Sequence, residues 1–235
     1  FNFNGQNTDV FVANLRDLGK ISVWKINPDW TLNNVVTLLA GPSSTGTSIS
    51  PDSYGWACWR NPSTSDLECF DKSKSSAQIK HWKISGTNGV ITSTLIRNVN
   101  TDVGINVAEG FVVNTASKKV YFNEKNPAQT HIYYADAALN PKTRLAVIQG
   151  NGLTPDYEGA AIYQCGNGNG YLVSSNQGAS NFKVFDLQTN ALVKTFTAQG
   201  SSGTDSLDVT SGSVPGYPNG FLAIHNDPGA DYRIY

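Results

Sequence analysis

A short strand-like segment recurs five times along this 235-residue chain, at intervals of 50 to 58 residues. In each copy, apolar or aromatic residues alternate with polar ones, which is the pattern of a β-strand with one buried face. The copies are Ile21–Ile26, Ile79–Ile84, His131–Asp136, Phe182–Leu187 and the shorter Tyr232–Tyr235. A strand repeat of this length is typical of β-propeller blades, because each blade needs neighbours to bury its faces.

Further strand candidates surround these copies. The pairs that precede a copy are Glu109–Val113 with Lys119–Glu124, Glu158–Tyr163 with Tyr171–Ser175, and Leu207–Thr210 with Phe221–His225. The candidates that follow a copy are Val35–Leu39, Thr92–Arg97, Leu145–Ile148 and Leu192–Thr197. Helical periodicity is missing throughout. The sequence therefore predicts an all-β fold in a single domain, 1–235: a β-propeller of five blades with four antiparallel strands each. An incomplete six-bladed ring is the alternative.

The last repeat stops after its third strand, so its outer edge needs a partner. Unpaired strand edges invite aggregation. The N-terminal segment Phe1–Asn4 could pair there and close the ring. The alternative is that Phe1–Asn4 forms the first strand of the first blade.

Charge and hydropathy exclude two kinds of partner. Only 15% of residues are charged and the net charge is −1, so there is no basic surface for nucleic acid. No apolar run approaches the roughly 20 residues that a membrane-spanning helix needs. The chain contains no Met and begins at Phe1, which predicts a removed leader and a secreted, extracellular protein.

The three cysteines favour the same compartment. Cys58 and Cys69 lie on two apolar stretches joined by a Pro/Ser/Thr-rich turn, so a hairpin would place them opposite each other. This arrangement predicts a disulfide, with two buried thiols as the alternative. Cys165 is expected to be a free, inert thiol.

Acidic residues are scarce, yet several stand where inner strands begin or end. They are Glu109, Glu124, Asp156, Glu158 and the Asp205–Asp208 segment. The inner strands of a propeller begin on one face around its channel, so these carboxylates from three blades should converge. Hard oxygen ligands without Cys or His favour Ca²⁺. The alternative is that each of them caps a turn locally.

The stretch from Ala108 to Ile224 resembles the β-propeller phytases. The resemblance is carried, in order, by Glu109–Val113, Val120–Glu124, Leu153–Gly159, Gly170–Gly178 and Thr204–Val209. It implies that Glu109, Glu124, Asp156, Glu158 and Asp205 bind calcium, and that Asp156 and Glu158 also take part in catalysis.

The first third of the chain resembles the family less closely. Asn14–Lys20 is similar to the segment whose arginine binds substrate phosphate, which implies this role for Arg16. Tyr54-Gly55-Trp56 resembles the segment with the active-site tyrosine, and Lys72 or Lys74 falls near a phosphate-binding lysine. The alternative for Arg16 and Lys74 is solvated loop charge.

Two departures from the family stand out. The family's first blade has no counterpart here, and Asn106-Val107-Ala108 brings no basic residue beside Glu109. The resemblance implies a calcium-dependent phosphomonoester hydrolase of phytate or a similar polyphosphate. The alternatives are a lectin-like propeller that binds a glycan, a catalytically inactive homologue of the family, or a structural propeller that holds calcium only for stability.

Overall fold

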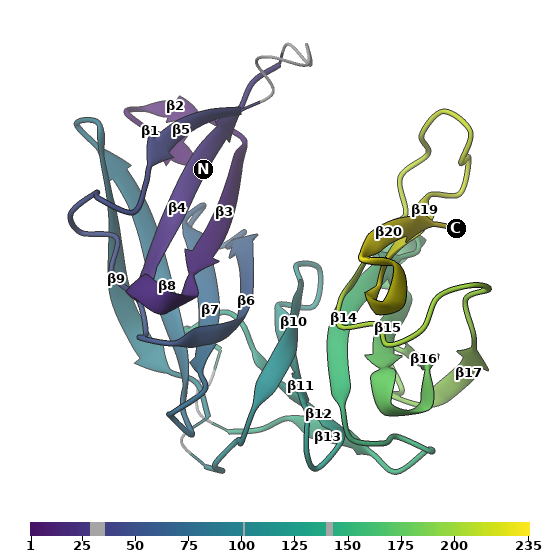
Figure 1. The fold of residues 1–235 in the computed structure, drawn as a ribbon. Helices are drawn as coiled ribbons and strands as arrows, with labels where there is room; N and C mark the ends of the chain where they lie inside the picture. Colours follow the sequence, from purple (N-terminus) through teal and green to yellow (C-terminus); the bar gives the residue numbers. More distant parts are fainter. Residues whose placement is uncertain (29–35, 101, 140–142) are drawn as a thin grey trace. The chain divides into compact units, whose positions relative to one another are not determined.

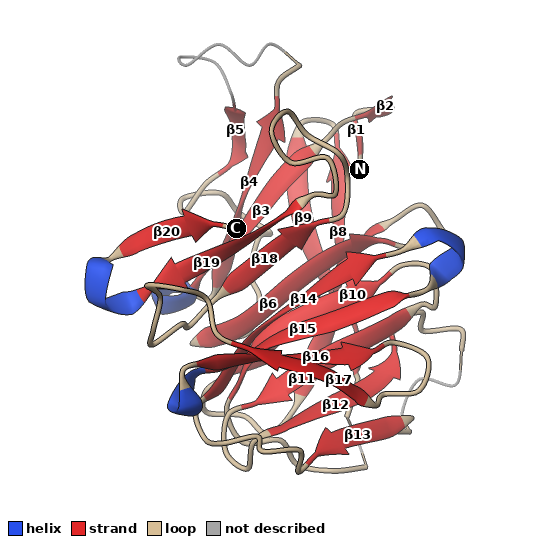
Figure 2. Cartoon of the chain, turned by 90° about the vertical axis from the view of Figure 1, so that its right-hand side faces the viewer, coloured by secondary structure: helices blue, strands red, loops and turns tan. Residues whose placement is uncertain are grey.

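The structure is a computed structural model that describes residues 1–28, 36–100, 102–139 and 143–235. Figure 2 shows that strands make up nearly all regular structure in these residues. The helical segments among them are four turns of three residues: η1 (Arg16–Leu18), η2 (Gly166–Gly168), η3 (Gln177–Ala179) and η4 (Asp227–Gly229). No helix in the described part of the chain is long and apolar enough to cross a membrane.

The chain folds as two compact units. Unit 1 contains residues Phe1–Ile105 and Asp136–Thr143, and unit 2 contains Asn106–Ala135 and Arg144–Tyr235.

Unit 2 consists of three antiparallel sheets whose strands follow chain order (Figure 1). The first contains β10 (Ala108–Asn114), β11 (Lys119–Glu124), β12 (Gln129–Tyr134) and β13 (Ala146–Gln149). The second contains β14 (Tyr157–Gln164), β15 (Gly170–Asn176), β16 (Asn181–Asp186) and β17 (Leu192–Phe196). The third contains β18 (Leu207–Thr210), β19 (Phe221–Asn226) and β20 (Asp231–Ile234). The recurring segment is the third strand in each case, as a blade repeat requires.

Unit 1 contains the other two sheets. One holds β3 (Val10–Leu15), β4 (Lys20–Ile26) and β5 (Val36–Ala40), and the other holds β6 (Ser53–Arg60), β7 (Leu67–Ser73), β8 (Ile79–Thr87) and β9 (Val90–Asn98). Strands β4 and β8 are the recurring segment. Residue 35, where the sequence predicted that β5 begins, lies outside the described residues. The all-β fold and the five blade-like sheets of a β-propeller are thus confirmed, although the first and last sheets have three strands.

Both predictions for Phe1–Asn4 are wrong. Strand β1 (Asn2–Phe3) pairs with β2 (Gln6–Asn7) and, in parallel, with the end of β8, where Phe3 stands opposite Gly86. Strand β8 extends beyond its last pairing with β7 at Ile84, so this edge is open to the N-terminal segment. The rings of Phe1 and Phe3 also pack on the apolar core of unit 1, which favours this position.

The cores lie between successive sheets. In unit 2, Tyr121 and Ile132 of the first sheet pack with Leu172 and Phe185 of the second. In unit 1, the predicted disulfide is confirmed: Cys58 and Cys69 are direct partners in the β6–β7 register and are bonded, while Cys165 is free.

Candidate functional site

Two inner strands of unit 2, β10 and β14, have the pair Glu-Gly directly after their first residue, and the glycine decides where the glutamate lies. A Cβ on Gly110 in β10 would lie 2.1 Å from the carbonyl oxygen of Glu158, so only glycine lets β14 approach this closely. A Cβ on Gly159 would likewise lie 2.9 Å from Cα of Ser206, just before β18. These approaches bring Glu109 and Glu158 into one cluster.

The cluster is built around the ammonium group of Lys125. Its Nζ lies 2.5 Å from Oε1 of Glu158, 3.3 Å from Oε1 of Glu109 and 3.6 Å from Oδ1 of Asp156. The Glu158 side chain is fully buried, whereas 28% of Lys125 and 55% of Asp156 remain exposed. We call Glu109, Lys125, Asp156 and Glu158 the Lys125 cluster. The basic residue missing beside Glu109 in the sequence is thus supplied by the residue that follows β11.

Burial controls the protonation of this cluster. It raises the pKa of Glu158 to about 8, and the neighbouring Glu109 acts in the same direction while Lys125 opposes both. For Lys125, burial lowers the pKa, but the ion pairs with Glu158 and Glu109 prevail and raise it. Glu158 can therefore exchange a proton near neutral pH, while Lys125 stays charged.

Three buried polar side chains hold the start of β14. Nδ2 of Asn123 donates to the carbonyl oxygens of Glu158 (2.8 Å) and Gly159 (3.1 Å). The hydroxyl of Thr130 donates to Oδ1 of Asn123 and lies 3.0 Å from the hydroxyl of Tyr157. This network fixes the backbone that carries Glu158.

The structure places Glu124 outside the Lys125 cluster. Its carboxylate accepts hydrogen bonds from the backbone N–H of Asn106 (2.7 Å) and Nε2 of Gln129 (2.6 Å), and lies 2.8 Å from Nε2 of His131. Burial would raise the pKa of Glu124, but the hydrogen bonds led by His131 keep it low. With three partners, this carboxylate is engaged within the protein.

Asp205 belongs to a second group of possible ligands. Asp205, His225 and Asp227 each offer one ligand atom, and these atoms lie within 4.8 Å of one another. Asp205 also accepts a hydrogen bond from Gln177, and its backbone oxygen accepts one from the Gly159 N–H. Sequence reasoning missed His225 and Asp227. The Asn226-Asp227-Pro228-Gly229 run, which forms the turn after β19, was the available signal.

In unit 1, two expected phosphate-binding residues, Arg16 and Lys74, meet at Tyr54, the expected active-site tyrosine. The guanidinium carbon of Arg16 lies 4.6 Å from the ring centre of Tyr54, and Nζ of Lys74 lies 4.2 Å from it. Arg16 also forms a 2.6 Å ion pair with Asp52. Cations against an aromatic face are held by electrostatic attraction to the ring. We call Arg16, Tyr54 and Lys74 the cation–tyrosine group.

Lys72 lies elsewhere. It is buried in β7, and its ammonium donates to the backbone oxygens of Ser73 and Ser76. Of the two lysines considered for phosphate binding, the structure brings Lys74 to Arg16 and Tyr54.

The donor chemistry of unit 2 fits a calcium ion. Carboxylate oxygens are the ligands that Ca²⁺ prefers, and Glu109, Asp156 and Glu158 supply them from neighbouring inner strands. Oε1 of the buried Glu158 is paired with Lys125, but its Oε2 has no hydrogen-bond donor among the described residues. Such a group is left ready for a cation.

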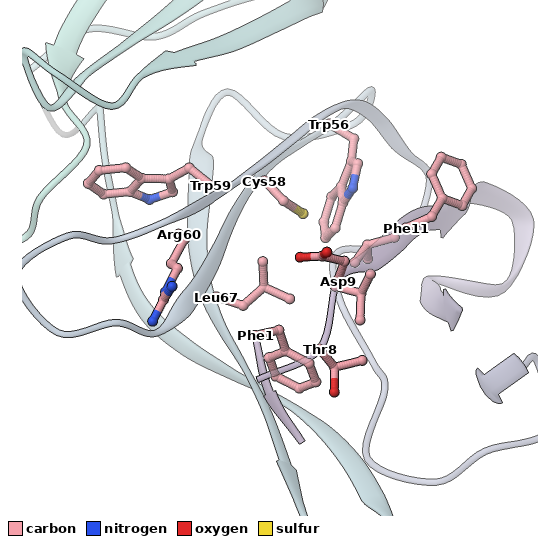
Figure 3. Close-up of a pocket in the computed structure, with 11 residues that line it drawn as sticks. Phe1, Thr8, Asp9, Phe11, Trp56, Cys58, Trp59, Arg60 and Leu67 are labelled. Carbon is pink, nitrogen blue, oxygen red and sulfur yellow. The ribbon is translucent and has the colours of Figure 1, made fainter. Parts of the chain in front are cut away.

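Unit 1 also contains a pocket of about 380 Å³, shown in Figure 3. Trp56, Trp59 and Phe11 line it together with the charged Asp9 and Arg60. In the described part of the structure, the indole N–H groups of both tryptophans have no hydrogen-bond acceptor. The pocket offers apolar rings beside polar groups, a combination common in sites for small molecules.

A family model and a curated relative point to the same family. A family model described as "Phytase" matches residues 1–231. The 3-phytase of Bacillus subtilis (strain 168) is 27% identical over 244 residues, which covers 98% of this chain. The chain spans 62% of the length of that relative.

Solved structures show the same fold. A functionally unknown protein from Desulfotomaculum acetoxidans DSM 771 is similar with a TM-score of 0.61 and 12% identity, covering 97% of this chain and 61% of that one. The β-propeller domain of Myceliophteria thermophila Cps50 (Swd1) is similar with a TM-score of 0.54 and 11% identity, covering 99% and 68%.

Proposed function

The chain belongs to the phytase family, and from this premise we propose that it is a calcium-dependent hydrolase of phosphomonoesters, with phytate or a similar polyphosphate as substrate. The observation that carries the proposal is the buried Glu158 carboxylate, which shares the Lys125 ammonium with Glu109 and Asp156 while its Oε2 has no donor among the described residues. The relative named as a 3-phytase supports the reaction class. The disulfide supports a secreted protein, since such bonds persist in oxidising compartments.

Each group has a role in this reaction. Bound calcium would neutralise phosphate charge and acidify a water molecule. Glu109, Asp156, Glu158 and Asp205 would hold calcium through their carboxylate oxygens. The buried Glu158, which lies in the same cluster, would also accept a proton at a carboxylate oxygen.

The substrate phosphates need fixed cations as well. Arg16 and Lys74 would bind phosphate oxygens through charge-assisted hydrogen bonds, with Tyr54 keeping both side chains in place.

Phosphate release from phytate tests the proposal. We expect release in calcium and at least a hundredfold less in chelator, with Glu158→Gln as inactive as the chelated protein. The matched control Glu68→Gln changes a buried glutamate of unit 1. Phosphate release by this variant should remain dependent on calcium. Equal rates in calcium and chelator, or no release by the folded protein, would refute the proposal.

A glycan-binding function is the second candidate, and the pocket between Phe11, Trp56 and Trp59 favours it. Aromatic rings stack on sugar faces, and the exposed Phe11 and half-buried Trp56 lie beside the polar groups of Asp9 and Arg60. Glycan-array binding that Trp56→Ala abolishes, without hydrolysis of phytate, would establish this function instead.

A further inference from the structure

The Lys125 cluster already contains a cation. Three carboxylates meet one ammonium group at 2.5, 3.3 and 3.6 Å, so Nζ of Lys125 stands at the point that these oxygens share. The backbone N–H of Lys125 donates to the carbonyl oxygen of Val107, 2.7 Å away, which fixes the residue beside the start of β10.

The ammonium leaves the cluster incompletely satisfied. Three ionised carboxylates would carry more negative charge than one lysine can neutralise. Glu158 is fully buried, and its Oε2 has neither an ion-pair partner nor a hydrogen-bond donor among the described residues. Burying a carboxylate oxygen without a partner costs free energy, and a further positive charge would reduce that cost.

We propose that Lys125 is a resident cation that competes with a divalent ion for Glu109, Asp156 and Glu158, and so sets the calcium concentration at which this site fills. The inference rests on the proposed calcium-dependent function, but its tests measure ion binding and not hydrolysis. Two cations cannot share one point between three carboxylates, because they repel each other. Calcium therefore enters only when the ammonium swings out, which the partial exposure of Lys125 permits.

The competition has a definite signature in variants. Lys125→Met keeps the aliphatic stem and removes the charge, so the carboxylates repel one another in chelator while calcium meets no competitor. We expect a lower melting temperature than wild type in chelator, a larger rise on adding calcium, and a calcium Kd at least tenfold lower by calorimetry. Lys119→Met, at the other end of β11 and outside the cluster, is the matched control and should bind calcium as wild type does.

A purely structural ion pair predicts a different result. Lys125→Met would then lose the same stability in chelator and in calcium, with an unchanged Kd, and either finding would overturn the proposal. Lys125→Arg keeps the charge and should retain the weak calcium binding of wild type. If Lys125→Arg instead binds calcium as tightly as Lys125→Met, charge is not the competing property.

The wild-type protein provides a test that does not depend on any variant folding. An amine-acylating reagent with detection by mass spectrometry should modify Lys125 several-fold faster in saturating calcium than in chelator, while Lys119 reacts at the same rate in both. An unchanged rate at Lys125 in the calcium-loaded protein would overturn displacement of the ammonium. Absent phytate hydrolysis with these ion effects intact would refute only the proposed function.

Discussion

At the scale of single residues, the hydrogen bonds of His81 determine its tautomer. Nε of Arg97 can only donate, and it lies 3.1 Å from Nδ1 of His81, so Nδ1 is the unprotonated acceptor. Nε2 then carries the proton and donates to Oε2 of Glu68, 2.8 Å away. A second proton on the ring would place the Nδ1–H of His81 opposite the Nε–H of Arg97, so this hydrogen bond would be lost and the two cations would repel each other.

This arrangement makes stability depend on pH. Burial lowers the pKa of His81, aided by Arg97 and opposed by Glu68 and Asp136. Because the folded pKa lies below the unfolded value of about 6.5, the neutral ring favours folding above that pH. The stability is lost as pH falls below 6.5 and through the folded pKa. Urea unfolding at pH 7.5 and 5.0 should show a smaller loss for His81→Gln than for wild type, whereas equal losses would contradict this assignment.

Lys74 and Lys72 differ in what they contact, and matching substitutions should separate their roles. Lys74→Met removes a cation beside Tyr54 and should raise the KM for phytate about ten- to hundredfold, with little change in stability, because a charge-assisted hydrogen bond is worth about 1.5–3 kcal/mol. Lys72→Met leaves the backbone oxygens of Ser73 and Ser76 without that donor and should cost about 1–3 kcal/mol of stability. Steady-state kinetics and urea unfolding measure the two effects. The reverse pattern would assign the phosphate to Lys72.

At the scale of strands, Gly110 tests whether close approach of β10 and β14 builds the Lys125 cluster. A methyl group there would lie 2.1 Å from the carbonyl oxygen of Glu158, so one strand must move. We expect Gly110→Ala to destabilise the fold by about 3 kcal/mol and to weaken calcium binding. Gly104→Ala is the control, because its Cβ would meet only Cβ of Ala77 at 3.7 Å, and it should change stability by less than about 1 kcal/mol. Comparable losses in both variants would point to backbone entropy instead.

The same scale shows how far the sequence predicts this protein. Strands such as β8, β12 and β16 are readable because alternating residues repeat at blade spacing, and the Cys58–Cys69 bond follows from the hairpin. The position of Phe1–Asn4 was not readable, since it depends on how far β8 extends beyond β7. The role of Lys125 could not be predicted from the sequence, because it depends on contacts with Glu109, Asp156 and Glu158 that form only when the strands pack together.

At the scale of the whole chain, the two candidate groups belong to different compact units. The cation–tyrosine group lies in unit 1, and the Lys125 cluster and Asp205 lie in unit 2. Their chemistry is opposite, since one group attracts anions and the other attracts cations. Ligands of opposite charge should therefore stabilise different parts of the chain.

Hydrogen exchange followed by mass spectrometry can locate each effect. Calcium should slow exchange most in the segments that carry Glu109, Asp156, Glu158 and Asp205, because a bound ion must leave before those strands open. Inorganic phosphate, used as the probe for the other group, should slow exchange most around Arg16, Tyr54 and Lys74. Asp156→Asn should reduce the calcium effect and leave the phosphate effect unchanged, while Arg16→Ala should do the opposite. If calcium protects only unit 1, or if each variant removes both effects, ion binding and phosphate binding are not divided between the units, and the roles assigned to these residues would be wrong.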